Sequence, residues 1–95
     1  MYVSRVEVTT EHASRYLQQL CKHWSHKFAV VFDAHSGRVP FNDHTQATFS
    51  ANASTLAIEL TTDEEDGGMR MQMVIADHLK RFAFREELRF FWQPA

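Results

Sequence analysis

The sequence is poor in cysteine, glycine and proline and has no long apolar run, and these shortages exclude several classes of protein. A single cysteine cannot form an intrachain disulfide, which argues against a small secreted domain held together by disulfides. No apolar run approaches the ~20 residues that a membrane-spanning helix needs. The N-terminal residues lack the apolar stretch of a signal peptide. We therefore expect a cytoplasmic protein with no membrane partner.

Common catalytic and nucleotide-binding motifs are also missing. Gly67-Gly68 lacks the spacing of a phosphate-binding loop, and the chain has no Gly-x-Ser-x-Gly nucleophile motif and no paired cysteines. The formal net charge is −2, so no overall attraction to nucleic acid is expected. No RNA-binding signature accompanies the aromatic residues. We therefore expect no cofactor and no nucleic-acid partner.

What the chain does contain is typical of one small globular domain. Its 95 residues predict a single domain over residues 1–95. Eight phenylalanines, two tyrosines and two tryptophans are many for this length. Because large rings bury much apolar area, we expect the modest core of this domain to be built around them.

Alternating apolar residues and turn residues predict five strands and two helices. The strands are expected at residues 2–8, 28–32, 38–41, 44–51 and 54–62, and the helices at residues 10–25 and 69–90. The run 28–32 is expected to be buried, and Pro40 to lie at an edge because it has no amide hydrogen to donate. The predicted fold class is α+β, with a two-layer β-α-β-β-β-β-α order, a curved antiparallel sheet and two helices on one face. This order is similar to the TATA-binding-protein-like arrangement, a likeness that does not imply DNA binding.

The first predicted helix carries both core and polar side chains. Its apolar positions follow a spacing of three and four residues: Ala13, Tyr16, Leu17, Leu20, Cys21 and Trp24. Cys21, His23 and His26 look like metal ligands, but successive residues turn by about 100°, so Cys21 faces the core, away from both histidines. His23 and His26 could share a ligand, with His78 or His44 as a third group. A structural zinc site needs four ligands, so we expect no metal site and keep His23 and His26 as the weaker alternative.

A basic stripe follows one face of the second predicted helix, at His78, Arg81, Arg85 and Arg89. Like charges four residues apart repel, so the stripe needs compensation. Asp77 could pair with Arg81, and Glu86 with Arg89. This structural interpretation stands beside a functional one, in which the arginines and Lys22 bind a carboxylate or phosphate.

Glu86 falls among the apolar positions of the second predicted helix. Either the helix ends or bends before it, or its carboxylate is buried, and a buried carboxylate must be paired or its pKa rises. A structural pair with an arginine is the simpler interpretation. An acid with a raised pKa beside histidines would instead be a candidate for acid–base chemistry.

Two segments resemble the signature segments of a family of small bacterial proteins of unknown function, the DUF2218 family. They are residues 15–27, RYLQQLCKHWSHK, and residues 78–88, HLKRFAFREEL. The resemblance spans nearly the whole chain. It implies a small bacterial protein of one domain without an established activity, so it assigns no role to any residue.

Three functions remain open, ranked in the order given. The first is a non-enzymatic binding module for a small anionic or metal-chelating ligand, with candidate residues Lys22, His23, His26, His78, Arg81, Arg85 and Glu86. The second is a homodimeric interaction protein that pairs through a third face of the second helix, at Met73, Phe84 and Phe91. The third is a small enzyme in which Glu86 and a histidine act as acid and base.

Overall fold

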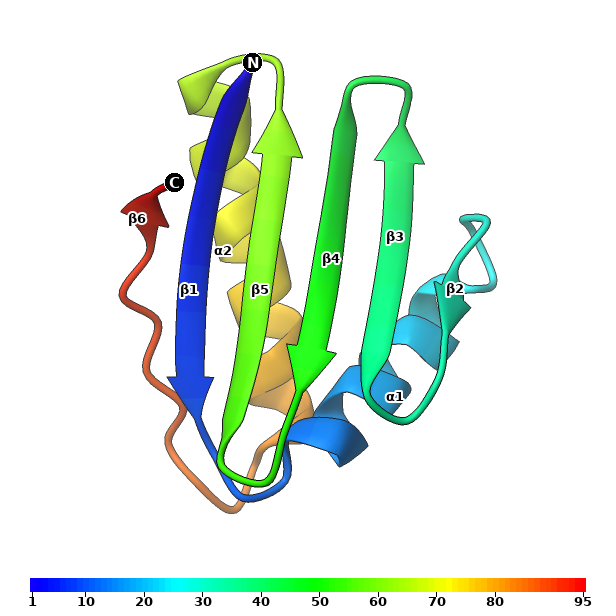
Figure 1. Ribbon diagram of the computed structural model, residues 1–95, viewed down its shortest axis with the longest axis vertical. Coiled ribbons are helices and arrows are strands. Elements are labelled where there is room, and N and C mark those ends of the chain that lie inside the picture. The colour runs from blue at the N-terminus through cyan, green and yellow to red at the C-terminus, as the bar shows by residue number, and fades with distance from the viewer.

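A single open sheet with both helices on one of its faces forms the protein (Figure 1). The computed structural model describes all 95 residues. In chain order the elements are β1 (Tyr2–Thr9), α1 (Ala13–Trp24), β2 (Val31–Phe32), β3 (Ser36–Asn42), β4 (Thr45–Ala51), β5 (Thr55–Thr62), α2 (Glu65–Phe82) and β6 (Gln93–Pro94). This confirms the predicted α+β class and element order, and it adds β6, which the sequence did not predict.

The sheet is antiparallel throughout, with the strand order β2-β3-β4-β5-β1-β6. Strands β2 to β5 form the predicted meander. β1 pairs with β5 over its full length, from Tyr2 opposite Thr62 to Thr9 opposite Thr55. β6 pairs with the other side of β1, through Pro94 and its neighbour. The N-terminal strand is therefore held between the meander and the C-terminal segment.

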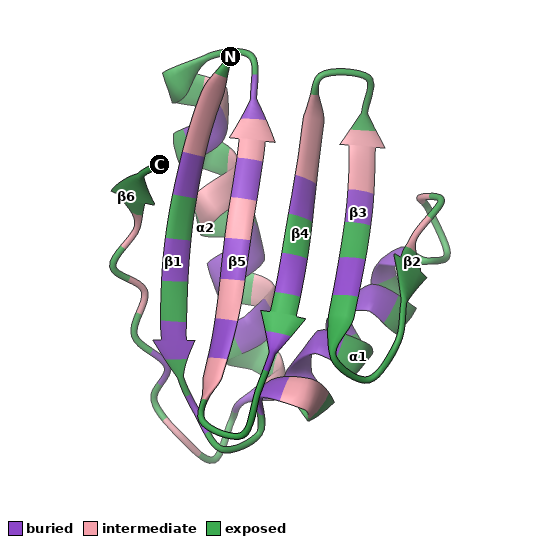
Figure 2. Ribbon diagram, viewed as in Figure 1, coloured by how far each residue is buried: buried purple, intermediate pink, exposed green.

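The core lies between the sheet and the helices because alternate residues of each strand point toward the helices. Figure 2 shows this as alternating bands of burial along β1 and β5. The largest fully buried side chains come from both layers: Leu17, Leu20, Leu56, Ile58, Leu60, Ile75 and Leu79. All six apolar positions predicted for α1 are buried, Cys21 completely. Cys21 is therefore a core residue, as predicted.

Two glycines let a helix approach a strand closely. A Cβ atom on Gly37 of β3 would lie 2.7 Å from Sγ of Cys21 on α1. A Cβ atom on Gly68 of α2 would lie 2.8 Å from the ring of Tyr2 on β1. Both distances are shorter than real carbon contacts, so each helix packs this closely only because the side chain is absent.

The second helix differs from its predicted range, 69–90. It begins at Glu65 and ends at Phe82. A helix continued from there to residue 90 would be about 39 Å long at 1.5 Å per residue, whereas the longest dimension of the molecule is 32 Å. It would run beyond the sheet and carry Leu88 away from the core. Instead the chain turns, Leu88 is buried, and residues 83–95 run back beside β1 (Figure 1).

The run 28–32, predicted as a buried strand, is mostly irregular. Only Val31–Phe32 pairs with β3, and this short strand is exposed at the edge of the sheet. The burial comes instead from Phe28, whose ring packs edge-on against Phe41 with centroids 5.1 Å apart. β2 covers only the first part of β3, so Pro40 lies on an open edge, as predicted.

The first helix is shorter than its predicted range, 10–25. Residues 10–12 form a turn in which Oγ1 of Thr10 accepts a hydrogen bond from the amide of His12 at 3.1 Å. The helix then begins at Ala13, and its first hydrogen bond runs from the amide of Tyr16 to the carbonyl of His12. The threonine hydroxyl thus positions the start of the helix from just outside it. Neither α1 nor α2 has the length and apolarity needed to cross a membrane.

Candidate functional site

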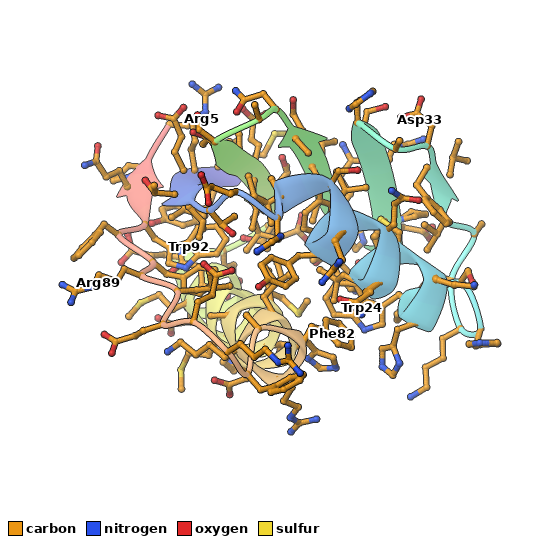
Figure 3. All side chains as sticks on the ribbon, turned by 90° about the horizontal axis from the view of Figure 1, so that it is seen from below. Arg5, Trp24, Asp33, Phe82, Arg89 and Trp92 are labelled. Atoms are coloured by element: carbon orange, nitrogen blue, oxygen red, sulfur yellow. The ribbon has the colours of Figure 1, made fainter.

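A groove of about 990 Å³ lies where the start of α1 meets the segment that follows α2. Polar and charged side chains line most of it: Thr10, Glu11, His12, Arg15, Tyr16, Gln19, Arg85 and Glu86. Phe82 and Phe84 add an apolar part. Figure 3 views this end of the molecule from below and shows Phe82 and Trp24 in the region between the two helices. The groove therefore gathers charged groups from two segments that are far apart in the sequence.

Glu86 is held in the groove by hydrogen bonds from two hydroxyl groups. Its Oε2 atom accepts a hydrogen bond from the hydroxyl of Tyr16 at 2.5 Å and another from the hydroxyl of Thr10 at 3.1 Å. Thr10 in turn is held by the amide of His12. The network joins the segment after α2 to the beginning of α1, so it sets the width of the groove at this point.

Burial and Glu86 both act on the acidity of Tyr16. Its ring is buried, and this burial, together with the hydrogen bond to Glu86 and the charge of that carboxylate, raises the pKa of Tyr16 to about 12. Arg15 opposes the shift weakly. At neutral pH the Tyr16 hydroxyl therefore keeps its proton and acts as a hydrogen-bond donor.

Two arginines line the groove without an ion-pair partner. The ion pairs of the protein are Arg5–Glu59 at 2.7 Å, His44–Asp63 at 3.4 Å and Arg89–Glu87 at 3.6 Å. Arg15 comes from α1, and Arg85 from the segment after α2. The guanidinium carbon of Arg85 lies 5.4 Å from the ring centroid of Phe84. Both guanidinium groups are therefore exposed donors that no carboxylate neutralises by direct contact.

The seven predicted site residues separate into two places. Arg85 and Glu86 line the groove. His23 and His78, from the two helices, form a second cluster with ring centroids 5.4 Å apart. The remaining three are exposed and belong to neither place: Lys22, His26 and Arg81.

The predicted basic stripe on α2 does not exist as one helical face, because Arg85 and Arg89 follow the end of the helix. Neither predicted ion pair forms: Asp77 does not pair with Arg81, and Arg89 pairs with Glu87 and projects outward from the chain (Figure 3). The predicted arginine partner of Glu86 is also wrong. Its partners are hydroxyl groups, and the helix ends before it, which was the first of the two alternatives for this residue.

Of the residues that line the groove, only Arg85 and Glu86 were predicted as site residues; those missed include Thr10, His12, Arg15 and Tyr16. Tyr16 was assigned to the core, which is correct for its ring but not for its hydroxyl. His12 and Gln19 of the α1 side also line the groove, whereas His23 does not. The signal was present, since His12, Arg15, Tyr16 and Gln19 follow one another at helical spacing.

No group of three or more His, Cys, Asp or Glu side chains is arranged so that it could hold a metal ion. His23 and His26, the weaker metal alternative in the sequence, are not part of such a group. His23 contacts His78 and the ring of Phe82 instead, with centroid distances of 5.4 and 6.3 Å.

Residues 5–93 match the model of a protein family described as uncharacterized proteins conserved in bacteria, DUF2218. The chain belongs to the DUF2218 family. The resemblance to this family, noted for residues 15–27 and 78–88, is thereby confirmed. The NMR structure of PA4090 from Pseudomonas aeruginosa is similar to this DUF2218 protein, with 41% sequence identity and a TM-score of 0.83 over 100% of this chain and 98% of that one. No curated protein matches the chain.

Proposed function

We propose that this DUF2218 protein is a binding module that holds a small anionic ligand, a carboxylate or a phosphate, in the groove between α1 and the segment after α2. One observation carries the proposal. Arg15 and Arg85 reach the same groove from two segments, and neither is in an ion pair. A guanidinium binds a carboxylate or phosphate through two parallel hydrogen bonds.

The charges of the groove favour a ligand that contacts the arginines directly. Two arginines face two glutamates, Glu11 and Glu86, so the formal charge of the lining is zero with His12 neutral. Attraction at long range is therefore weak, and affinity must come from contact. Each charge-assisted hydrogen bond contributes about 1.5–3 kcal/mol. The carboxylate of Glu86 is partly satisfied by Tyr16 and Thr10, which lessens its repulsion of an anion.

A small metal-chelating ligand was the other chemistry expected from the sequence, and this groove would bind it only through its anionic groups. The donors that are free in the groove are guanidinium groups, which remain protonated and cannot ligate a metal. Gln19 and His12 add hydrogen-bonding groups on the α1 side. Phe82 and Phe84 provide apolar area for a short carbon skeleton.

Isothermal titration with inorganic phosphate and, separately, with succinate tests this function. We expect saturable binding of at least one probe, weakened at least about tenfold in Arg15→Gln and in Arg85→Gln, because each variant removes a charged donor pair. Arg81→Gln is the matched control, since Arg81 is exposed and lies outside the groove. Equal losses in all three variants, or no saturable binding of either probe, would contradict the proposal.

A homodimeric interaction protein is the second candidate, favoured by exposed apolar side chains. Phe84 is 77% exposed, Phe91 70% and Met73 66%. They do not form one helical face, because only Met73 lies on α2. Light scattering at micromolar concentration distinguishes this candidate: a dimer that dissociates in Phe91→Ser supports it, and a monomer rejects it.

An acid–base enzyme is the candidate with the least support. It required a histidine within hydrogen-bond reach of Glu86. The groups that reach Glu86 are the hydroxyls of Tyr16 and Thr10, and no histidine hydrogen-bonds to it. His12 lines the same groove, but its ring contacts the Tyr16 ring edge-on with centroids 6.1 Å apart. Glu86 and His12 therefore share the groove without a hydrogen bond between them.

A further inference from the structure

Two histidines, one from each helix, lie close together where α1 and α2 meet. His23 is exposed near the end of α1, and His78 is half-buried on α2. Their ring centroids are 5.4 Å apart, with an angle of 50° between the ring planes. Two imidazoles bound to one tetrahedral metal ion, at ~2.0–2.1 Å per bond, have centroids roughly 5 Å apart. The observed separation is therefore close to that of two imidazoles on one ion.

His78 is oriented as metal-bound histidines are. Its Nδ1 donates a hydrogen bond to the backbone carbonyl of Val74 at 2.7 Å. A carbonyl only accepts, so this bond fixes the proton on Nδ1 and leaves the lone pair of Nε2 free. Most histidines that bind metals make this contact with the ring nitrogen that does not face the metal.

An aromatic ring lies beside each of the two histidines and restricts how its imidazole can turn. The ring of Trp24 lies 5.1 Å from that of His78, and Phe82 packs edge-on against His23 at 6.3 Å. Trp24 is buried and Phe82 half-buried, so packing against the core holds both of these neighbouring rings in place. A histidine side chain that is already oriented loses less conformational entropy when it binds a metal ion.

We propose that His23 and His78 form a surface site for one divalent transition-metal ion that prefers imidazole ligands, such as Zn²⁺, Cu²⁺ or Ni²⁺. The protein supplies two ligands, and water or a small donor molecule completes the coordination. The site is separate from the proposed anion groove, because neither histidine lines that groove. A failure of metal binding would therefore leave the proposed anion binding untouched, and the reverse also holds.

The test uses the full chain without a polyhistidine tag and titrates it with Zn²⁺ by calorimetry. We expect one ion per chain, with affinity lowered at least about tenfold in His23→Gln and in His78→Gln, as even the loss of an outer-shell partner does at metal sites. His26→Gln is the matched control, because His26 is exposed near the same helix end and outside the pair. Its affinity should match that of the wild type.

A second readout comes from Trp24, which lies beside His78. In a Trp92→Phe background Trp24 is the only tryptophan, and Cu²⁺ at the site should quench its fluorescence in a saturable way that disappears in His23→Gln. His23 is exposed, so this variant does not disturb the core. Zn²⁺ binding that survives both histidine variants, an equal loss in His26→Gln, or no quenching of Trp24 would overturn the proposal.

Discussion

The hydroxyl of Tyr16 donates a hydrogen bond to Oε2 of Glu86 at 2.5 Å and so connects two residues 70 positions apart in the sequence. Tyr16 stands on the buried face of α1, and Glu86 stands in the segment that leaves α2. The contact fixes this segment against the first helix. It also places Arg85, the residue just before Glu86, at the groove.

We expect Tyr16→Phe to lower the free energy of unfolding by about 1–2 kcal/mol, because a hydrogen bond to a charged group is lost while Thr10 still binds Glu86. Urea denaturation measures the change. Tyr2→Phe is the control, since the Tyr2 hydroxyl makes no hydrogen bond within the protein, and it should be nearly neutral. Equal effects in both variants would show that the Tyr16–Glu86 bond adds nothing to stability.

Stability should decline at alkaline pH because of Tyr16. Its pKa is raised from 10.0 to about 12 in the folded protein, first by burial and then by Glu86. A raised pKa stabilises the folded state fully below pH 10, and this contribution is lost as the pH rises from about 10 toward 12. Urea denaturation at several pH values should show a steeper decline for the wild type than for Tyr16→Phe. Parallel declines would contradict this account.

The regular part of the fold could be predicted from the sequence because its signals are local. The apolar spacing of α1 correctly predicted all six of its buried positions, including Cys21. The meander was readable from alternating strand residues. The end of α2 could not be predicted from the sequence, because Phe84 and Arg85 still fit a helical pattern. What stops the helix is the length of the sheet beneath it and the burial of Leu88, and neither is encoded at neighbouring positions.

The prediction of the candidate site was affected by the error in the end of α2. Arg85 and Glu86 were identified as candidates, but their partners could not be, since the partners lie on α1. Tyr16 was interpreted as a core residue because its ring follows the apolar spacing. An amphipathic side chain can bury its ring and still present its hydroxyl to a polar group. The sequence allowed His78 to lie near His23, but only the packing of the two helices shows that the rings are in contact.

Gly37→Ala should destabilise the protein by about 1–3 kcal/mol, because the new methyl group would lie 2.7 Å from Sγ of Cys21 in a filled core. In a Cys21→Ala background the same change should cost much less, since the sulfur is gone. Urea denaturation of the four proteins gives the coupling between the two sites.

Gly67→Ala is the matched control for this prediction. A Cβ atom there meets nothing within 4 Å, and alanine is a better helix former by up to about 1 kcal/mol. It should therefore be neutral or stabilising. A cost for Gly37→Ala that is the same with and without the Cys21 sulfur would refute close packing as the cause.

The thiol of Cys21 should be almost inert in the folded protein. Cys21 is fully buried, and burial raises the pKa of its thiol to about 11, so little reactive thiolate is present at neutral pH. A chromogenic disulfide reagent should react slowly in buffer and rapidly in urea, at a rate that follows unfolding. Reaction in buffer as fast as that of a free thiol would mean that the packing of α1 on β3 opens readily.

Anion binding between Arg15 and Arg85 is the central claim, and mapping of backbone amide NMR shifts during a titration with inorganic phosphate tests it most directly. The account predicts saturable shifts concentrated at the groove, around Arg15, Tyr16 and Glu86, that vanish in the Arg15→Gln, Arg85→Gln double variant. Shifts centred instead on basic residues outside the groove, such as Arg38 or Arg70, or shifts that remain in the double variant, would contradict it.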